Sequence, residues 1–126
     1  MPQPDVMALT ALEAAFRHGD EWLDQLRPYL QGNLDFLTDF FQHRIPKIKV
    51  IQPQGTYLVW LDCRELALDK QQLHKFFCKA GVGLDDGWRF GPGGEGFMRI
   101  NIACPRVTLG DALKRIEAAT PKVQQS

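Results

Sequence analysis

The sequence predicts a two-layer α+β domain in which helices cover one small, mainly antiparallel sheet. The chain has 126 residues, of which 44% are hydrophobic, so it can bury one core. Apolar residues recur at helical spacing in the first third of the chain and at strand spacing directly after it. Short strand patterns then alternate with two further helical patterns. This order predicts helices packed against a single sheet.

Two helices are predicted at the N-terminal end. The apolar spacing over residues 8–16 predicts the first, which Gly19 ends. Asp20 is predicted to cap a long second helix over residues 20–45. Its apolar stripe consists of Leu23, Leu26, Leu30, Leu34, Leu37 and Phe41. Pro28 removes a backbone donor inside this pattern, so a kink or a break is expected there.

A change to a period of two follows the long helix. Residues 47–50 alternate between charged and apolar side chains, which predicts a half-exposed strand. Residues 53–55 form a predicted turn, because they combine proline and glycine. Residues 56–62 are apolar on both faces and predict an interior strand. The short link between the two strands predicts a hairpin.

A third helix is predicted after this hairpin. Asp69 and Gln72 have the spacing of a capping box, and Gly81 ends the helix. Its apolar face consists of Leu73, Phe76, Phe77 and Ala80. Residues 85–87, Asp-Asp-Gly, are predicted to form a turn.

The last strand and helix complete the predicted domain. Residues 97–103 form a clear strand pattern, with Met98, Ile100 and Ile102 on one face. Thr108 with Asp111 is predicted to cap the final helix, which is expected to end near Pro121. Its apolar face consists of Leu109, Ala112, Leu113 and Ile116.

Charge and composition exclude several classes of partner. Lys and Arg together number 15 and so do Asp and Glu, which argues against nucleic acid or an anionic membrane surface. The apolar runs are too short to cross a bilayer, and the first residues lack the pattern of a signal peptide. Three cysteines without a Cys-x-x-Cys pair favour reduced thiols and a cytoplasmic location. The three histidines are scattered, so no metal site is expected.

Arg99 is the most informative residue for function. It lies in the middle of a predicted strand, on the face opposite Met98. One interpretation is a solvent-facing side chain or a structural ion pair. The other is a rigidly held guanidinium that binds a carboxylate with two hydrogen bonds. Asn101, on the same face, would either orient the same ligand or cap a loop.

The sequence offers no clear catalytic centre. The glycine-rich segment 91–96 has no following Lys-Ser/Thr and precedes a strand, so a plain turn is favoured over a phosphate cradle. The only serine is Ser126, and no lysine has the apolar setting that Schiff-base chemistry requires. The residues therefore indicate a domain that holds a substrate for chemistry performed elsewhere.

Three segments carry a resemblance to a known family. Residues 91–106, GPGGEGFMRINIACPR, resemble the C-terminal signature of pyridoxal-phosphate enzymes of the MalY/PatB type. These are cystathionine β-lyase or C–S lyase relatives in the class I/II aminotransferase superfamily. Residues 53–62, PQGTYLVWLD, are similar to the small-domain strand of the family. Residues 19–24 and 29–33 are similar to its long interdomain helix, and the resemblance extends over residues 8–117.

This resemblance implies a C-terminal fragment of a two-domain enzyme. Residues 1–19 would be an N-terminal segment with the last helix of a missing large domain, 20–45 the connecting helix and 46–126 the small domain. The large domain would carry the cofactor lysine and bind pyridoxal 5'-phosphate. The chain alone would then hold no catalytic residue, no cofactor and no metal. A two-domain enzyme of this kind needs far more than 126 residues.

The resemblance also implies roles for two arginines. Arg99 would bind the α-carboxylate of an amino-acid substrate such as cystathionine, while the cofactor acts as the electron sink. Arg106 belongs to the signature and is expected to brace a helix end or an interface. Arg106 and Asn101 are the candidate residues that surround the substrate site without contacting the substrate. The choice between lyase and aminotransferase activity depends on the missing domain.

Two other functions remain open from the sequence. One is an independent regulatory domain that binds small carboxylates through Arg99. The other is a structural domain whose exposed Trp22 and Phe36 faces bind a partner chain. Without a large domain, the long helix is expected to cover its apolar surface with a second copy, as a homodimer or a domain swap.

Overall fold

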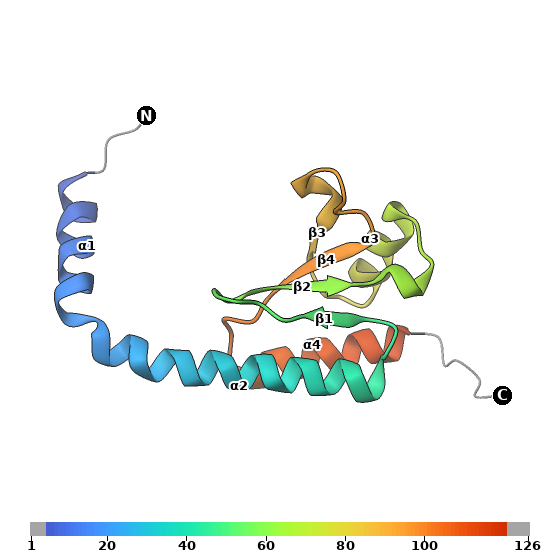
Figure 1. Ribbon diagram of the computed structural model, residues 1–126, viewed down its shortest axis with the longest axis horizontal. Coiled ribbons are helices and arrows are strands. Elements are labelled where there is room, and N and C mark those ends of the chain that lie inside the picture. Colours follow the sequence, from blue (N-terminus) through green and yellow to red (C-terminus); the bar gives the residue numbers. More distant parts are fainter. Residues whose placement is uncertain (1–4, 121–126) are drawn as a thin grey trace. The chain divides into compact units, whose positions relative to one another are not determined.

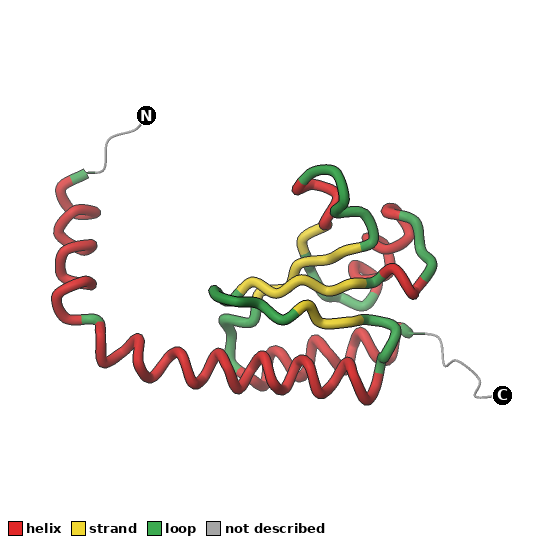
Figure 2. The backbone as a smooth tube through the Cα atoms, viewed as in Figure 1, coloured by secondary structure: helices red, strands yellow, loops and turns green. Residues whose placement is uncertain are grey.

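The computed structural model describes residues 5–120 as two compact units that divide between Gly32 and Asn33. The first unit contains α1 (Val6–His18) and the beginning of α2 (Asp20–Arg44). The second unit contains the remainder of α2, one sheet and two further helices (Figures 1 and 2).

The first helix is confirmed, but the predicted cap of the second is wrong. Asp5 accepts a hydrogen bond from Ala8 N at 2.7 Å and caps α1, which ends at Gly19. The backbone N–H of Leu23 donates to Gly19 O, so the hydrogen bonds of α2 begin at Gly19. Asp20 therefore lies in the first turn of α2, where its charge still complements the helix dipole.

The long helix is also confirmed, and the predicted break at Pro28 is wrong. α2 is one continuous helix of 25 residues, and Pro28 lies inside it. Proline removes only the donor that would pair with the carbonyl of Asp24, so the turns on either side can still form. A kink at Pro28 stays a prediction.

The sheet has four antiparallel strands in the order β1-β2-β4-β3. Their bounds are β1 Lys49–Ile51, β2 Leu58–Asp62, β3 Asp85–Asp86 and β4 Phe97–Asn101. β1 and β2 form the predicted hairpin, and β2 is an interior strand as predicted.

The predicted turn at residues 85–87 is wrong for its first two residues. Asp85 pairs with Arg99 and Asp86 with Met98, so both belong to an edge strand. Aspartate is uncommon in strands, and here pairing with β4 outweighs that local preference. Gly87 then begins a 3-10 turn, η2 (Gly87–Phe90).

The remaining helices confirm one predicted cap and correct another. α3 (Lys70–Lys79) begins with the predicted capping box of Asp69 and Gln72. α4 (Arg106–Ala119) begins two residues before Thr108, so the predicted Thr108–Asp111 cap is wrong. Leu109 N donates to the carbonyl of Pro105, whose fixed φ suits a helix start. Pro121 lies outside the described residues.

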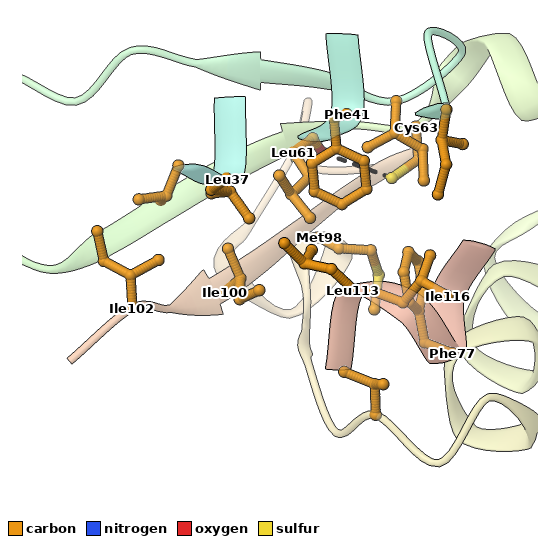
Figure 3. Packing of buried hydrophobic residues seen from close by; sticks show 14 of the residues in the cluster. Leu37, Phe41, Leu61, Cys63, Phe77, Met98, Ile100, Ile102, Leu113 and Ile116 are labelled. Atoms are coloured by element: carbon orange, nitrogen blue, oxygen red, sulfur yellow. Dashed lines mark hydrogen bonds between the residues drawn. The ribbon is translucent and has the colours of Figure 1, made fainter. Parts of the chain in front are cut away.

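One core unites the helices and one face of the sheet. Leu37 and Phe41 of α2 pack over β2 and β4, and Leu113 of α4 and Phe77 of α3 approach from the same side (Figure 3). Side chains buried on this face of the sheet are Val59, Leu61, Met98 and Ile100. The two-layer α+β fold is therefore confirmed. Within residues 5–120, no helix is long and apolar enough to cross a membrane.

Candidate functional site

Arg99 lies on the face of the sheet opposite the helical layer. Because its neighbours Met98 and Ile100 point into the core, the pleat directs Arg99 to the other face. The strand register places it between Trp60 of β2 and Asp85 of β3. The candidate site is therefore formed by residues of three strands.

An ion pair with Asp85 holds the Arg99 guanidinium. Nε and Nη2 of Arg99 donate to the same carboxylate oxygen, Asp85 Oδ2, at 3.2 and 2.9 Å. The guanidinium lies over the ring of Phe90, 4.4 Å from its centroid. Of the two interpretations left open above, the structural ion pair is present in the structure. It is solvent-exposed, since the Asp85 side chain keeps 58% of its surface accessible.

This ion pair leaves part of the guanidinium available. Among the described residues, no hydrogen bond involves Arg99 Nη1, and the second oxygen of Asp85 does not contact Arg99. Nη1 and the outer N–H of Nη2 are the pair of donors that a second carboxylate would bind. The arrangement can thus hold Arg99 in place and still bind an anion.

An open apolar pocket of about 370 Å³ has in its wall two neighbours of Arg99, although Arg99 itself does not line it. Trp60 and Phe90 form part of its wall, and their rings meet edge to face at 5.3 Å. Since Phe90 also contacts Arg99, the same ring links the cation to the pocket. The site therefore combines one oriented positive charge with an aromatic wall.

The glycine-rich segment contains turns, as predicted, and forms part of the wall of this pocket. Gly91 and Gly93 have positive φ angles of 118° and 90°, which other residues rarely adopt. Gly94 packs so tightly that a Cβ there would lie 2.1 Å from the carbonyl oxygen of Gly87. The glycines thus shape the backbone around the pocket.

Arg64 is a second arginine that pairs with an aspartate through the same two nitrogens. Its Nε and Nη2 donate to the two oxygens of Asp62 at 2.9 and 2.7 Å. This pairing holds the pKa of Asp62 below its usual value, despite an opposing effect of burial. Arg99 differs from Arg64 in its position between Trp60 and Asp85 in the sheet and in its contact with the ring of Phe90.

The two other predicted site residues stabilise backbone segments. Asn101 Oδ1 accepts a hydrogen bond from Ala103 N at 2.8 Å, so Asn101 caps the loop after β4. Arg106 Nε donates to Asn33 Oδ1 at 3.0 Å, and Asn33 is fully buried on α2. Both side chains thus have structural contacts, and whether either also affects a substrate stays a prediction.

Sequence reasoning missed the residues that surround Arg99. The sequence predicts Asp85 in a turn, gives no role to Phe90, and places Trp60 only within an interior strand. The signal that could have identified Trp60 is its even spacing from Leu58 and Asp62 on the outer face of β2. No group of three or more metal-binding side chains lies close together among residues 5–120.

The comparisons with known proteins extend these observations. The family model for aminotransferase class I and II matches residues 5–116. The chain belongs to this family. It is 42% identical over 116 residues to the cystathionine beta-lyase PatB of Bacillus subtilis, covering 91% of this chain and 30% of PatB. It is 41% identical over 110 residues to protein MalY of Escherichia coli, covering 86% of this chain and 28% of MalY.

A solved structure supports the same relationship. The pyridoxal-phosphate-bound C–S lyase of Staphylococcus hominis superposes with a TM-score of 0.84 at 34% identity. The match covers 94% of this chain and 32% of that structure. The resemblance to MalY/PatB-type enzymes is thus confirmed, and the chain spans about 30% of the length of these relatives.

The described residues do not fit covalent attachment of the cofactor. Schiff-base chemistry requires a lysine in a buried or apolar setting. Every lysine among residues 5–120 is exposed, namely Lys47, Lys49, Lys70, Lys75, Lys79 and Lys114. A lysine that forms a Schiff base would therefore have to lie outside residues 5–120.

Proposed function

We propose that this chain is the small-domain part of a pyridoxal-phosphate-dependent C–S lyase that acts on an amino acid such as cystathionine. Arg99 binds the α-carboxylate of that substrate. The observation that carries the proposal is the open donor edge of Arg99 beside an apolar pocket, in a chain 42% identical to PatB. The charged α-carboxylate is the feature of such a substrate that the donor edge of Arg99 accommodates.

In this proposal the chain binds and orients the amino-acid substrate. Pyridoxal phosphate, when bound by the rest of the enzyme, would supply the electron sink for bond cleavage. Asp85 and the Phe90 ring hold the Arg99 guanidinium in one plane. Two parallel hydrogen bonds to the substrate carboxylate then fix the orientation of the substrate, which is the main contribution of a positioning residue.

The proposed domain boundaries follow the family. Residues 1–19 belong to the end of the large domain, 20–45 to a connecting helix and 46–126 to the small domain. The two compact units divide at Gly32, inside the proposed connecting helix. A connecting helix is expected to take part in both domains, and this division agrees with that role.

A chimera with PatB tests the proposal. The segment of PatB that aligns with this chain is replaced by the chain itself, which is feasible because 116 residues align. We expect the purified chimera to bind pyridoxal phosphate and to release pyruvate from cystathionine, whereas PatB truncated before that segment is inactive. A chimera that folds and binds the cofactor, yet cleaves no cystathionine, would contradict the proposed function.

The isolated chain is proposed to form a homodimer. The first unit exposes large apolar side chains, including Leu12, Phe16 and Trp22, at 55%, 79% and 67% of their surface. Large apolar side chains exposed in this way favour association with a second copy. Light scattering at a protein concentration of about 100 µM is expected to show a dimer for the wild type.

A double substitution provides the control for the dimer. Leu12→Asp with Phe16→Asp places two charges on that surface and is expected to give a monomer with unchanged helical content. A monomeric wild type at the same concentration would exclude this mode of association.

A further inference from the structure

A second polar cluster lies where α3 meets β3, and it plays no part in the proposed substrate site. Cys78 Sγ lies 3.4 Å from His74 Nε2, and His74 Nδ1 lies 3.0 Å from Asp86 Oδ1. Cys78 and His74 are four residues apart, so both lie on one face of α3. Cys78 is exposed, whereas Asp86 keeps only 3% of its surface accessible.

The order of these contacts defines the role of each group. An ionised carboxylate only accepts hydrogen bonds, so His74 has to carry its proton on Nδ1 toward Asp86. Nε2 then presents its lone pair to the thiol of Cys78 and can accept its proton. Asp86 stabilises the imidazolium that forms. A nucleophile, a base and an orienting acid in this sequence are the arrangement that activates cysteine in enzymes.

The other two cysteines lack this arrangement. Cys63 is 1% exposed, and burial raises the pKa of its thiol to about 12. Cys104 is half-buried and, among the described residues, has no histidine within hydrogen-bond distance of its sulfur. Cys63 and Cys104 therefore serve as internal controls for the reactivity of Cys78.

A basic pocket adjoins the cluster and indicates the charge of the reaction partner. It has a volume of about 290 Å³, and His74 and Asp86 form part of its wall, whereas Cys78 lies one helical turn beyond His74 and does not line it. The other charged side chains in its wall are Lys70, Lys75 and Arg89. Arg89 lies 3.4 Å from Asp86 and offsets its charge, so the two lysines leave the pocket positive. An anionic molecule is favoured there.

We propose that Cys78 is a modification site at which small anionic disulfides form a mixed disulfide. The thiol transfers its proton to His74 Nε2, and the thiolate attacks one sulfur of the disulfide. The S–S bond of the reagent breaks while a bond forms between Cys78 and one half. The other half leaves as a thiolate and takes back the proton from His74. One disulfide and one thiol enter the reaction, and one of each leaves it.

Alkylation kinetics of the whole chain test the role of His74. His74 Nε2 lies next to the thiol and acts as the base that accepts its proton when the sulfur attacks. Removing this base from an exposed thiol is expected to lower the rate about tenfold. His74→Gln is expected to slow alkylation of Cys78 by iodoacetamide about tenfold, measured by peptide mapping.

His43→Gln is the matched control for this substitution. His43 is also exposed on a helix and pairs with a carboxylate, that of Asp39, but no cysteine lies beside it. This variant is expected to leave the rate at Cys78 unchanged. Free imidazole adds a readout that structural damage does not produce, because it is expected to restore part of the rate in His74→Gln by replacing the missing base. Equal rates at Cys78 in the wild type and His74→Gln would overturn the proposal.

Two disulfides of opposite charge test the proposed partner class. Oxidised glutathione is anionic and cystamine is cationic at pH 7. Each rate at Cys78 is divided by the rate of N-acetylcysteine amide, an uncharged thiol, with the same reagent, which removes the intrinsic reactivity of the disulfide. The normalised rate is expected to be about fivefold higher for oxidised glutathione than for cystamine. In about 0.5 M salt the two normalised rates are expected to become similar, because salt screens the charges of the pocket. A normalised preference for cystamine would overturn the assignment of an anionic partner.

Discussion

Replacing Arg99 with alanine in the PatB chimera is expected to lower kcat/KM for cystathionine by about 30-fold to 5,000-fold. Removing one partner of a buried, hydrogen-bonded charge pair costs about 2–5 kcal/mol, and about 1.36 kcal/mol corresponds to one factor of ten. We expect KM to rise because the carboxylate loses its anchor, and kcat to fall because the substrate loses its orientation. Steady-state pyruvate release measures both parameters.

Arg99→Lys and Arg64→Ala are the matched controls for this prediction. Lysine keeps the positive charge but lacks the planar pair of donors, so Arg99→Lys is expected to recover the activity only in part. Arg64 pairs with Asp62 through the same two nitrogens but has no proposed contact with the substrate, so Arg64→Ala is expected to change kcat/KM by less than about threefold. Equal losses for Arg99→Ala and Arg64→Ala would exclude a specific carboxylate contact.

The ion pair between Arg99 and Asp85 is compatible with this role. Asp85 is 58% exposed and contacts the guanidinium through a single oxygen. Exposed ion pairs of this type contribute about 0–1 kcal/mol, which is less than the proposed contact with a substrate enclosed between domains. Asp85 can therefore stay bonded to the Nε edge of Arg99 while the substrate binds. If the substrate displaces Asp85, the lost ion pair costs little free energy.

The fold was largely predictable because the apolar pattern of each helix and strand is contained in its own short stretch of sequence. The apolar periods of the helices and of β2 and β4 follow directly from which face each element buries. The capping box of Asp69 and Gln72 depends only on spacing within one helix end. The errors concern Asp20, Thr108 and the strand at Asp85, where neighbouring backbone groups or a distant strand decide the structure.

The candidate site was predictable only for its central residue. The position of Arg99 on the outer face follows from strand alternation. Its partner Asp85 is 14 residues away and reaches it only because β3 pairs with β4. The same limit applies to Cys78 and His74, whose helical spacing is visible in the sequence while Asp86 comes from another element. Contacts between elements depend on register, which a single sequence does not encode locally.

Asn33→Ala is expected to destabilise the second unit by about 2–4 kcal/mol. Asn33 is fully buried, and its Nδ2 donates to the carbonyl oxygens of Ile102 and Cys104, both at 2.9 Å. Its Oδ1 accepts from Arg106 Nε. These three bonds tie α2 to the loop between β4 and α4, and each costs about 1 kcal/mol to lose, with a further cost for polar groups left buried.

Two variants separate this buried network from the loss of a single contact. Asn101→Ala makes the same chemical change at an exposed residue with one hydrogen bond, so a cost below about 1 kcal/mol is expected. Arg106→Ala is expected to cost less than Asn33→Ala, because Arg106 is exposed and the two bonds from Asn33 to the loop carbonyls remain. Urea unfolding followed by circular dichroism, with all proteins at one concentration, gives the free energies of unfolding. If Asn33→Ala and Asn101→Ala lower stability equally, the link between α2 and this loop does not hold the domain together, because a buried network has to cost more than one exposed bond.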